Sequence, residues 1–199
     1  MGMMDKIAEV IATTSTEFMA QCYKLNSAPS VGTLVKTIGE NNEDIFGVVY
    51  NIETHSMETG RRVSVRGEKI NSVQEIYRTN PQLEKLLVTD FNVVIVGCSQ
   101  QGKLCYYIAS QPSFIHSFVY ICQAEEVRKF SQSLDFLNLL VEPKLAVSTD
   151  EVLAASLRFM SNYCNDPRSF LINASKELVW ILRGDLYRLN SILKRVNIG

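Results

Sequence analysis

The sequence predicts a small closed β-barrel of six or seven strands followed by a C-terminal helical part, so the fold class is mainly β barrel plus α. Within residues 31–67, two strand-like runs, Thr33–Ile38 and Ile45–Glu53, are joined by a polar turn. Glycines recur every few residues in this stretch, as they do at the corners of small barrels. After Gln123 the spacing of apolar residues changes from the period of strands to that of helices.

Composition limits the classes of protein to which the chain can belong. Hydrophobic residues make up 46% and charged residues 21% of the 199 residues, so the chain can bury a sizeable core and disorder is not expected. The net charge of −1 does not indicate a strongly basic nucleic-acid binder. No run approaches the roughly 20 apolar residues that cross a bilayer, and the N-terminus lacks the apolar core of a signal peptide. We therefore expect a soluble cytoplasmic protein without membrane contact.

Alternation of apolar and polar residues places the strands in order along the chain. Lys6–Ala12 is a short apolar run with no clear assignment. A tight polar connection between the two runs that follow residue 90 predicts a β-hairpin. The predicted strands are Glu17–Leu25, Thr33–Ile38, Ile45–Glu53, a short one at Arg62–Arg66, Asp90–Cys98, Lys103–Ala109 and Phe118–Cys122.

A helical excursion is expected to interrupt the strands at residues 72–87. Ser72 and Glu75 have the spacing of a capping box, which begins a helix. Asn80-Pro81 is expected to begin a second short helix, with Pro at its first position. The predicted organisation is thus a barrel over residues 1–122 that contains this excursion.

Residues 123–199 are predicted to form a helical region packed on the barrel. Asp166-Pro167 has the residue types of an N-cap followed by the first helical position. The amphipathic stripes of the helices expected in this region predict that they pack within the molecule. The expected helices are Ala124–Phe130, Leu134–Val141, one capped by Thr149 or Asp150 and ending near Cys164, one that starts after Asp166, and a last one capped by Asp185 that carries Leu186, Leu189, Ile192, Leu193 and Val196.

The segments STEFMAQCYKL, GTLVK and GVVYNIET, with GRR after the last, resemble a HAS-barrel. This small barrel is shared by HerA-type DNA-translocating ATPases and the N-terminal domains of ATP synthase subunits. The resemblance covers roughly residues 5–122 and implies a barrel like the ATP synthase N-terminal one. It also implies a role in assembly, crowning a ring of subunits or docking partners. The ATPase core that normally follows is missing, so only the assembly role carries over.

A phosphate-binding loop is the sharpest alternative interpretation. Residues 97–103 match G-x-x-x-x-G-K after a strand. The motif requires Ser or Thr next, to hold Mg²⁺, and Leu104 stands there. A helix must also follow, yet LCYYIA favours a strand. We therefore predict a hairpin turn at this position.

No catalytic set emerges from the titratable residues, so we expect a protein that is not an enzyme. His116 lacks a triad context and is interpreted as a hydrogen-bonded residue at a strand start. His55 is expected in a polar loop, in contact with solvent. Glu125 and Glu126 are adjacent, so on a helix they point apart and form no acid–base pair.

The five cysteines show no C-x-x-C spacing, and only two histidines are present. Metal ligation needs several such side chains brought together. We therefore expect reduced thiols, no metal and no cofactor.

A local excess of positive charge lies near residue 65. The residues are Arg61, Arg62, Arg66 and Lys69. A solvated loop is one interpretation; a contact to nucleic acid or to an acidic partner is the other.

The expected function is that of a non-enzymatic assembly or adaptor protein that binds a protein partner or itself, and nucleic acid only weakly. The first alternative is a nucleic-acid-associated accessory factor of a HerA-like system, which a salt-dependent shift of DNA would favour. The second is a divergent nucleotide-binding protein, which thermal stabilisation by nucleotide would favour.

Overall fold

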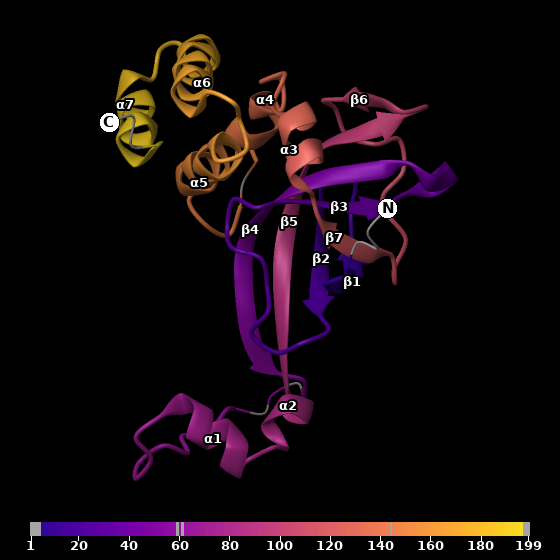
Figure 1. Ribbon diagram of the computed structural model, residues 1–199, viewed down its shortest axis with the longest axis vertical. Coiled ribbons are helices and arrows are strands. Elements are labelled where there is room, and N and C mark those ends of the chain that lie inside the picture. The colour runs from indigo at the N-terminus through magenta and orange to yellow at the C-terminus, as the bar shows by residue number, and fades with distance from the viewer. Residues whose placement is uncertain (1–4, 59, 61, 144, 197–199) are drawn as a thin grey trace.

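A computed structural model describes residues 5–58, 60, 62–143 and 145–196 of the chain. Six antiparallel strands close into a barrel, because β2 pairs with β5 as well as with β1. The order around the barrel is β2-β1-β7-β3-β4-β5, and β6 pairs with β5 outside it. The predicted fold class, a closed barrel with a helical part, is confirmed (Figure 1). The strands are β1 Ala8–Thr13, β2 Glu17–Cys22, β3 Leu34–Ile38, β4 Asp44–Ser56, β5 Leu87–Gln100, β6 Lys103–Cys105 and β7 Phe118–Ile121.

The interior of the barrel is filled by the alternate apolar residues of each strand. On β5, Phe91, Val93 and Ile95 belong to this interior cluster, whereas Val94 and Val96 face outward. Such alternation is what the two-residue period of a strand requires. Gly47 of β4 lies so close to β5 that a Cβ there would stand 2.3 Å from Cγ1 of Val93. The barrel therefore needs glycine at this point of closest approach.

Two strand predictions need correction, and one strand was not predicted. The apolar run Lys6–Ala12 is part of a strand, β1, which pairs with both β2 and β7. The predicted strand Lys103–Ala109 ends at Cys105, because β6 has only β5 as a neighbour. Residues 62–66 adopt no regular structure, although their alternation is typical of a strand, since no strand in the described part of the chain pairs with them.

Helix ends follow the capping residues in most places. Ser72 Oγ accepts a hydrogen bond from the Glu75 amide at 3.2 Å, and Asp166 accepts one from the Ser169 amide at 3.0 Å. Residues 40–42 form a 3-10 turn, η1. The helices are α1 Val73–Thr79, α2 Leu83–Leu86, α3 Ala124–Phe130, α4 Leu137–Val141, α5 Thr149–Ser161, α6 Pro167–Ile181 and α7 Leu186–Val196.

Three helix starts differ from the prediction by one to three residues. α2 begins at Leu83, because residues 81–82 form a turn rather than the first helical positions. α4 begins at Leu137 rather than Leu134. The N-cap of α5 is Ser148, just before the predicted Thr149.

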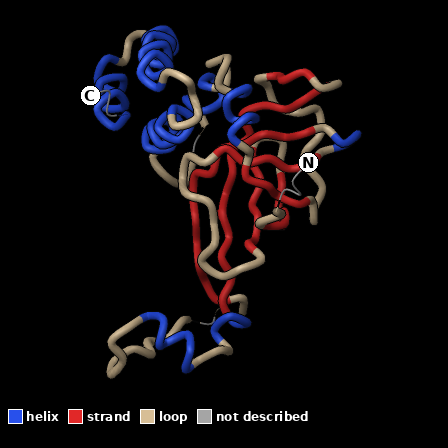
Figure 2. Tube along the Cα trace, viewed as in Figure 1, coloured by secondary structure: helices blue, strands red, loops and turns tan. Residues whose placement is uncertain are grey.

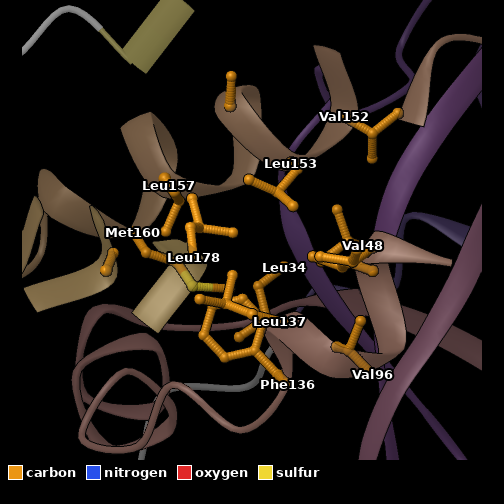
Figure 3. Packing of buried hydrophobic residues seen from close by; sticks show 14 of the residues in the cluster. Leu34, Val48, Val96, Phe136, Leu137, Val152, Leu153, Leu157, Met160 and Leu178 are labelled. Atoms are coloured by element: carbon orange, nitrogen blue, oxygen red, sulfur yellow. The ribbon is translucent and has the colours of Figure 1, made fainter. Parts of the chain in front are cut away.

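The C-terminal helices pack on the outer face of the barrel through one continuous apolar cluster (Figure 3). Leu34, Val48 and Val96 supply the barrel side, and Leu153 and Phe136 belong to the helical side. Phe130 lies at the junction, with ring centroids 5.3 Å from Phe46 and 5.6 Å from Phe136. The cluster makes the outer face of β3, β4 and β5 dependent on the helices for its burial.

A second junction between barrel and helices is an ion cluster. Lys36 Nζ lies 2.7 Å from Glu126 Oε1 on α3 and 3.3 Å from Asp44 Oδ2 on β4. The lysine side chain is only 10% exposed. A buried amine needs such partners, because an unpaired charge there would be costly.

We call residues 57–86, between β4 and β5, the arm. It contains α1 and α2, joined by loops, and it projects from the far end of the β4–β5 pair (Figures 1 and 2). Leu83 is the one hydrophobic side chain of the arm that is buried, among the described residues. The arm therefore adds little to either apolar cluster.

Candidate functional site

The predicted basic cluster lies on the arm. Arg62, Arg66 and Lys69 are exposed there, whereas Arg61 lies outside the described residues. Arg66 Nη1 donates to Asn80 Oδ1 at 3.0 Å, which ties the loop to the end of α1. Arg62 and Lys69 form no ion pair with any residue that the structure describes. Two of these cations are thus directed to solvent and available for a ligand.

Exposed apolar side chains accompany these cations. Met57, Val63 and Val73 are 59–63% exposed, and Val65 is 97% exposed. The alternation that suggested a strand at residues 62–66 instead places cations and valines together on a loop. Sequence reasoning identified the charges but missed the valines. The Val-Ser-Val run at residues 63–65 was the only sequence feature that indicated these valines, and the same alternation is expected of an edge strand.

Contacts that hold the arm are few and mostly local. The Met57 amide donates to the Leu86 carbonyl at 2.9 Å, which closes the base of the arm. A Cβ on Gly67 would lie 2.9 Å from Cδ1 of Ile76, so the loop runs close over α1. A cavity of about 50 Å³ separates the loop from α2. A cavity of this volume is too small for a drug-sized ligand, so any partner must bind the outer surface of the arm.

A second mixed surface, which we call the rim, lies at the opposite end of β4 and β5 from the arm. It consists of Ile38, Glu40 and Glu43 around η1 and of Phe114 and Ile115 in the loop before β7. Phe114 is 60% and Ile115 48% exposed. Ser117 Oγ donates to the Ile38 carbonyl at 3.1 Å, which joins the two parts. The rim thus combines apolar and acidic side chains.

A hollow of about 430 Å³ borders the rim. Its lining includes Glu43 just after η1, Ser99 near the end of β5 and Gln101 in the β5–β6 turn. The side chains of Glu40 and Glu43 form no ion pair within the described part of the chain. Their charges are therefore free to act on a partner.

His55 lies on β4 rather than in a polar loop, which corrects the prediction. Its Nε2 lies 3.0 Å from Oδ2 of Asp90, and its Nδ1 lies 3.0 Å from the carbonyl oxygen of Ser56. Gln21 Nε2 donates to the other oxygen of Asp90 at 2.9 Å. Asp90 itself is buried.

Both partners of His55 are acceptors, so both ring nitrogens carry a proton when both bonds are made. The Asp90 carboxylate, with the Ser56 carbonyl, raises the pKa of His55. A doubly protonated ring has no lone pair for a metal or for accepting a proton. Below the pKa of His55, the ring therefore forms an ion pair with Asp90 across β4 and β5.

The residues that suggested a phosphate loop form the β5–β6 hairpin turn, as predicted. Gln101 and Gly102 have φ values of 51° and 78°, and Gln100 pairs with Lys103 across the turn. Positive φ at both central residues is the geometry of a two-residue type I′ hairpin. β6 follows directly, in the place where a phosphate loop would begin a helix.

The remaining acid and histidine candidates are dispersed. Glu125 contacts Arg128 at 2.9 Å, whereas Glu126 turns to Lys36, so these two glutamates diverge as predicted. His116 Nδ1 lies 2.9 Å from Glu9 Oε1, which confirms a hydrogen-bonded histidine. It precedes β7 by two residues.

All five cysteines are free thiols. Burial raises the pKa of Cys22 to about 11 and that of Cys98 to about 11, and it holds the pKa of Cys122 well above its ordinary value. Over the described ranges, no three His, Cys, Asp or Glu side chains are grouped so that they could hold a metal ion.

A third exposed apolar surface lies where α6 meets α7. Trp180 and Leu186 are each 69% exposed, and Tyr187 is 88% exposed. The sequence placed Leu186 on the buried stripe of the last helix, which is wrong, because only Leu189, Ile192 and Val196 of this helix are fully buried. Acidic and basic residues alternate here, as in Arg183 and Asp185.

Comparison with known proteins gives no assignment: no protein-family model matches the chain, and no curated protein matches its sequence. Among the helices of the described residues, none has the length and apolar character to span a membrane.

Proposed function

We propose that this chain is a non-enzymatic assembly or adaptor protein that binds a protein partner, or a second copy of itself, through the arm. The observation that carries the proposal is the exposed surface formed by Val63, Val65, Arg62 and Lys69 on the arm. A contiguous exposed apolar group rimmed by charge is typical of an interaction site.

The energetics support a protein ligand. Burying a valine side chain contributes roughly 1.5–3 kcal/mol, so Val63 and Val65 together could anchor an interface. Flanking arginines are enriched in interfaces, where they form hydrogen bonds to carboxylates. The resemblance of residues 5–122 to HAS-barrels, which implies assembly, supports the same proposal. The five free thiols support a cytoplasmic location, since disulfides form mainly in oxidising compartments.

The second candidate is a nucleic-acid-associated accessory factor of a HerA-like system. The exposed cations of the arm favour it, because basic clusters bind phosphates. However, the exposed apolar residues of the arm are aliphatic. Stacking of bases needs aromatic rings, so protein is the better fit.

The test places a photo-crosslinking amino acid at Val65 and, as a matched control, at Tyr187, in the full chain inside its native cell. We expect discrete protein adducts from position 65 only. Substituting Val63→Ser should reduce their yield, since the neighbouring anchor is lost. Adducts from position 187 alone, or from neither position, would contradict the proposal.

A further inference from the structure

We propose that the occupant of the arm is the rim of a second copy of this chain. The inference rests on the proposed function and names its partner. It follows from the opposite charges and the shared apolar character of the two surfaces, and from their positions at the two ends of one β-ribbon.

Charge complementarity comes first. The arm presents Arg62 and Lys69 without an ion pair among the described residues, and the rim presents Glu40 and Glu43 in the same condition. Asp44, next to the rim, is already neutralised, because its Oδ2 lies 3.3 Å from Lys36 Nζ. It therefore does not compete with Glu40 and Glu43 for the cations of the arm. Opposite unpaired charges steer two surfaces together and fix their register.

Apolar side chains match as well. Val63 and Val65 lie between Arg62 and Lys69 in the chain, and both are exposed. Phe114 and Ile115 are exposed on the loop that the Ser117–Ile38 hydrogen bond joins to the segment before Glu40. Interfaces combine an apolar centre with a polar border, and each of these surfaces has both parts. Contact would remove four exposed apolar side chains from water.

Geometry requires the contact to be between copies. β4 begins beside the rim at Asp44 and ends at the base of the arm at Ser56, and β5 pairs with it along this length. At about 3.3 Å per residue, the thirteen residues of β4 follow roughly 40 Å of chain, with bulges near Gly47 and Tyr50, and pairing with β5 keeps its two ends apart. The arm therefore cannot fold back onto its own rim. Because the arm and the rim are different surfaces, the contact is heterologous, so it closes into a ring or continues as a chain.

The experiment is a charge exchange followed by sedimentation velocity over a wide range of protein concentration. The wild type should associate reversibly. An arm variant, R62E with K69E, and a rim variant, E40K with E43K, should each raise the dissociation constant about tenfold or more, since like charges then face one another. An equimolar mixture of the two variants should associate again, because each arm meets a rim of opposite charge. That rescue also shows that both variants fold.

A matched control removes the exposed apolar corner of α6 and α7 with L186S and Y187S, and it should associate like the wild type. A wild type that stays monomeric at every concentration would overturn the inference. So would association that survives both charge reversals, that fails to return in the mixture, or that is lost in the control. A monomer whose arm still forms adducts with other proteins would leave the proposed function standing without this partner. A monomer without adducts would contradict both the proposed function and this inference.

Discussion

His55 is a residue whose protonation state is set by its two neighbours. The Asp90 carboxylate and the Ser56 carbonyl both accept hydrogen bonds, and they raise the pKa of the imidazole above its ordinary value of 6.5. Because the folded state holds the proton more tightly, the pair stabilises the fold fully below pH 6.5. That contribution is lost as the pH rises through the pKa of the folded state.

We predict that His55→Gln lowers the melting temperature most at acidic pH and hardly at all at alkaline pH. The side chain is 48% exposed, so the loss of stability should be about 0.2–1 kcal/mol, as for solvated ion pairs. Thermal unfolding of the wild type and the variant, from acidic to alkaline pH, measures the difference in melting temperature. A difference that grows as the pH rises would contradict the assignment.

The cysteines give a second prediction at this scale. Burial keeps Cys98 and Cys122 away from solvent and raises their pKa, so little thiolate is present at neutral pH. A thiol reagent should therefore modify the native protein slowly at these two positions, and it should titrate all five cysteines once the chain is denatured without reductant. Fewer than five thiols, or stoichiometric zinc in the purified protein, would show that a disulfide or a metal site had been missed.

At the scale of the elements, the backbone at the entry to β3 lies close against the backbone of α5. Gly32 has a φ of +89°, and a Cβ there would lie 2.4 Å from the backbone carbon of Ala155 on α5. Both the conformation and the lack of space exclude a side chain. The contact fixes α5 against the strands.

We predict that Gly32→Ala destabilises the protein by about 2–4 kcal/mol, through a left-handed backbone and an overpacked contact. Gly184→Ala is the matched control, because Gly184 has a φ of +100° but open space around it. It should cost only the conformational part, about 1–2 kcal/mol. Denaturant unfolding compares them, and equal losses would mean that the approach to α5 is not tight.

The arm gives a prediction on nucleic acid. DNA binding by the full chain should be weak at physiological salt and should fall steeply as salt rises, since each neutralised phosphate adds about 0.9 to the slope. Replacing Arg61, Arg62, Arg66 and Lys69 with Ala should remove it and leave the melting temperature nearly unchanged. Tight sequence-selective binding would move the accessory-factor hypothesis into first place, and binding that survives the substitutions would mean that another surface is used.

At the scale of the whole molecule, barrel and helices share one apolar cluster. Leu34, Phe46, Val48, Val94 and Val96 line the outer barrel face, and they are buried because α3, α4 and α5 cover them. An exposed apolar face of that size promotes aggregation.

We therefore predict that a fragment of residues 1–122 does not fold into a stable barrel, although the sequence pattern separates it from the helical region. The full chain should unfold in one transition, with the same midpoint for near-ultraviolet and far-ultraviolet circular dichroism. A fragment that is monomeric and melts cooperatively would show that the barrel is independent of its helices.

The sequence by itself determined the features that depend on neighbours along the chain. Alternation predicted most strands, Ser72 and Asp166 predicted two helix starts, and the residues between β5 and β6 predicted a tight hairpin. It also identified the cations of the arm, because charge is a property of single residues.

Tertiary structure decided what depends on partners far apart in the sequence. Pairing of β2 with β5 closes the barrel and turns the apolar run near the N-terminus into a strand. It also brings Gln21, His55 and Asp90 together. The absence of a neighbouring strand leaves Val63 and Val65 exposed on a loop, although their alternation is that of a strand. Local patterns state a preference for a conformation, and only the available partners decide whether that preference is satisfied.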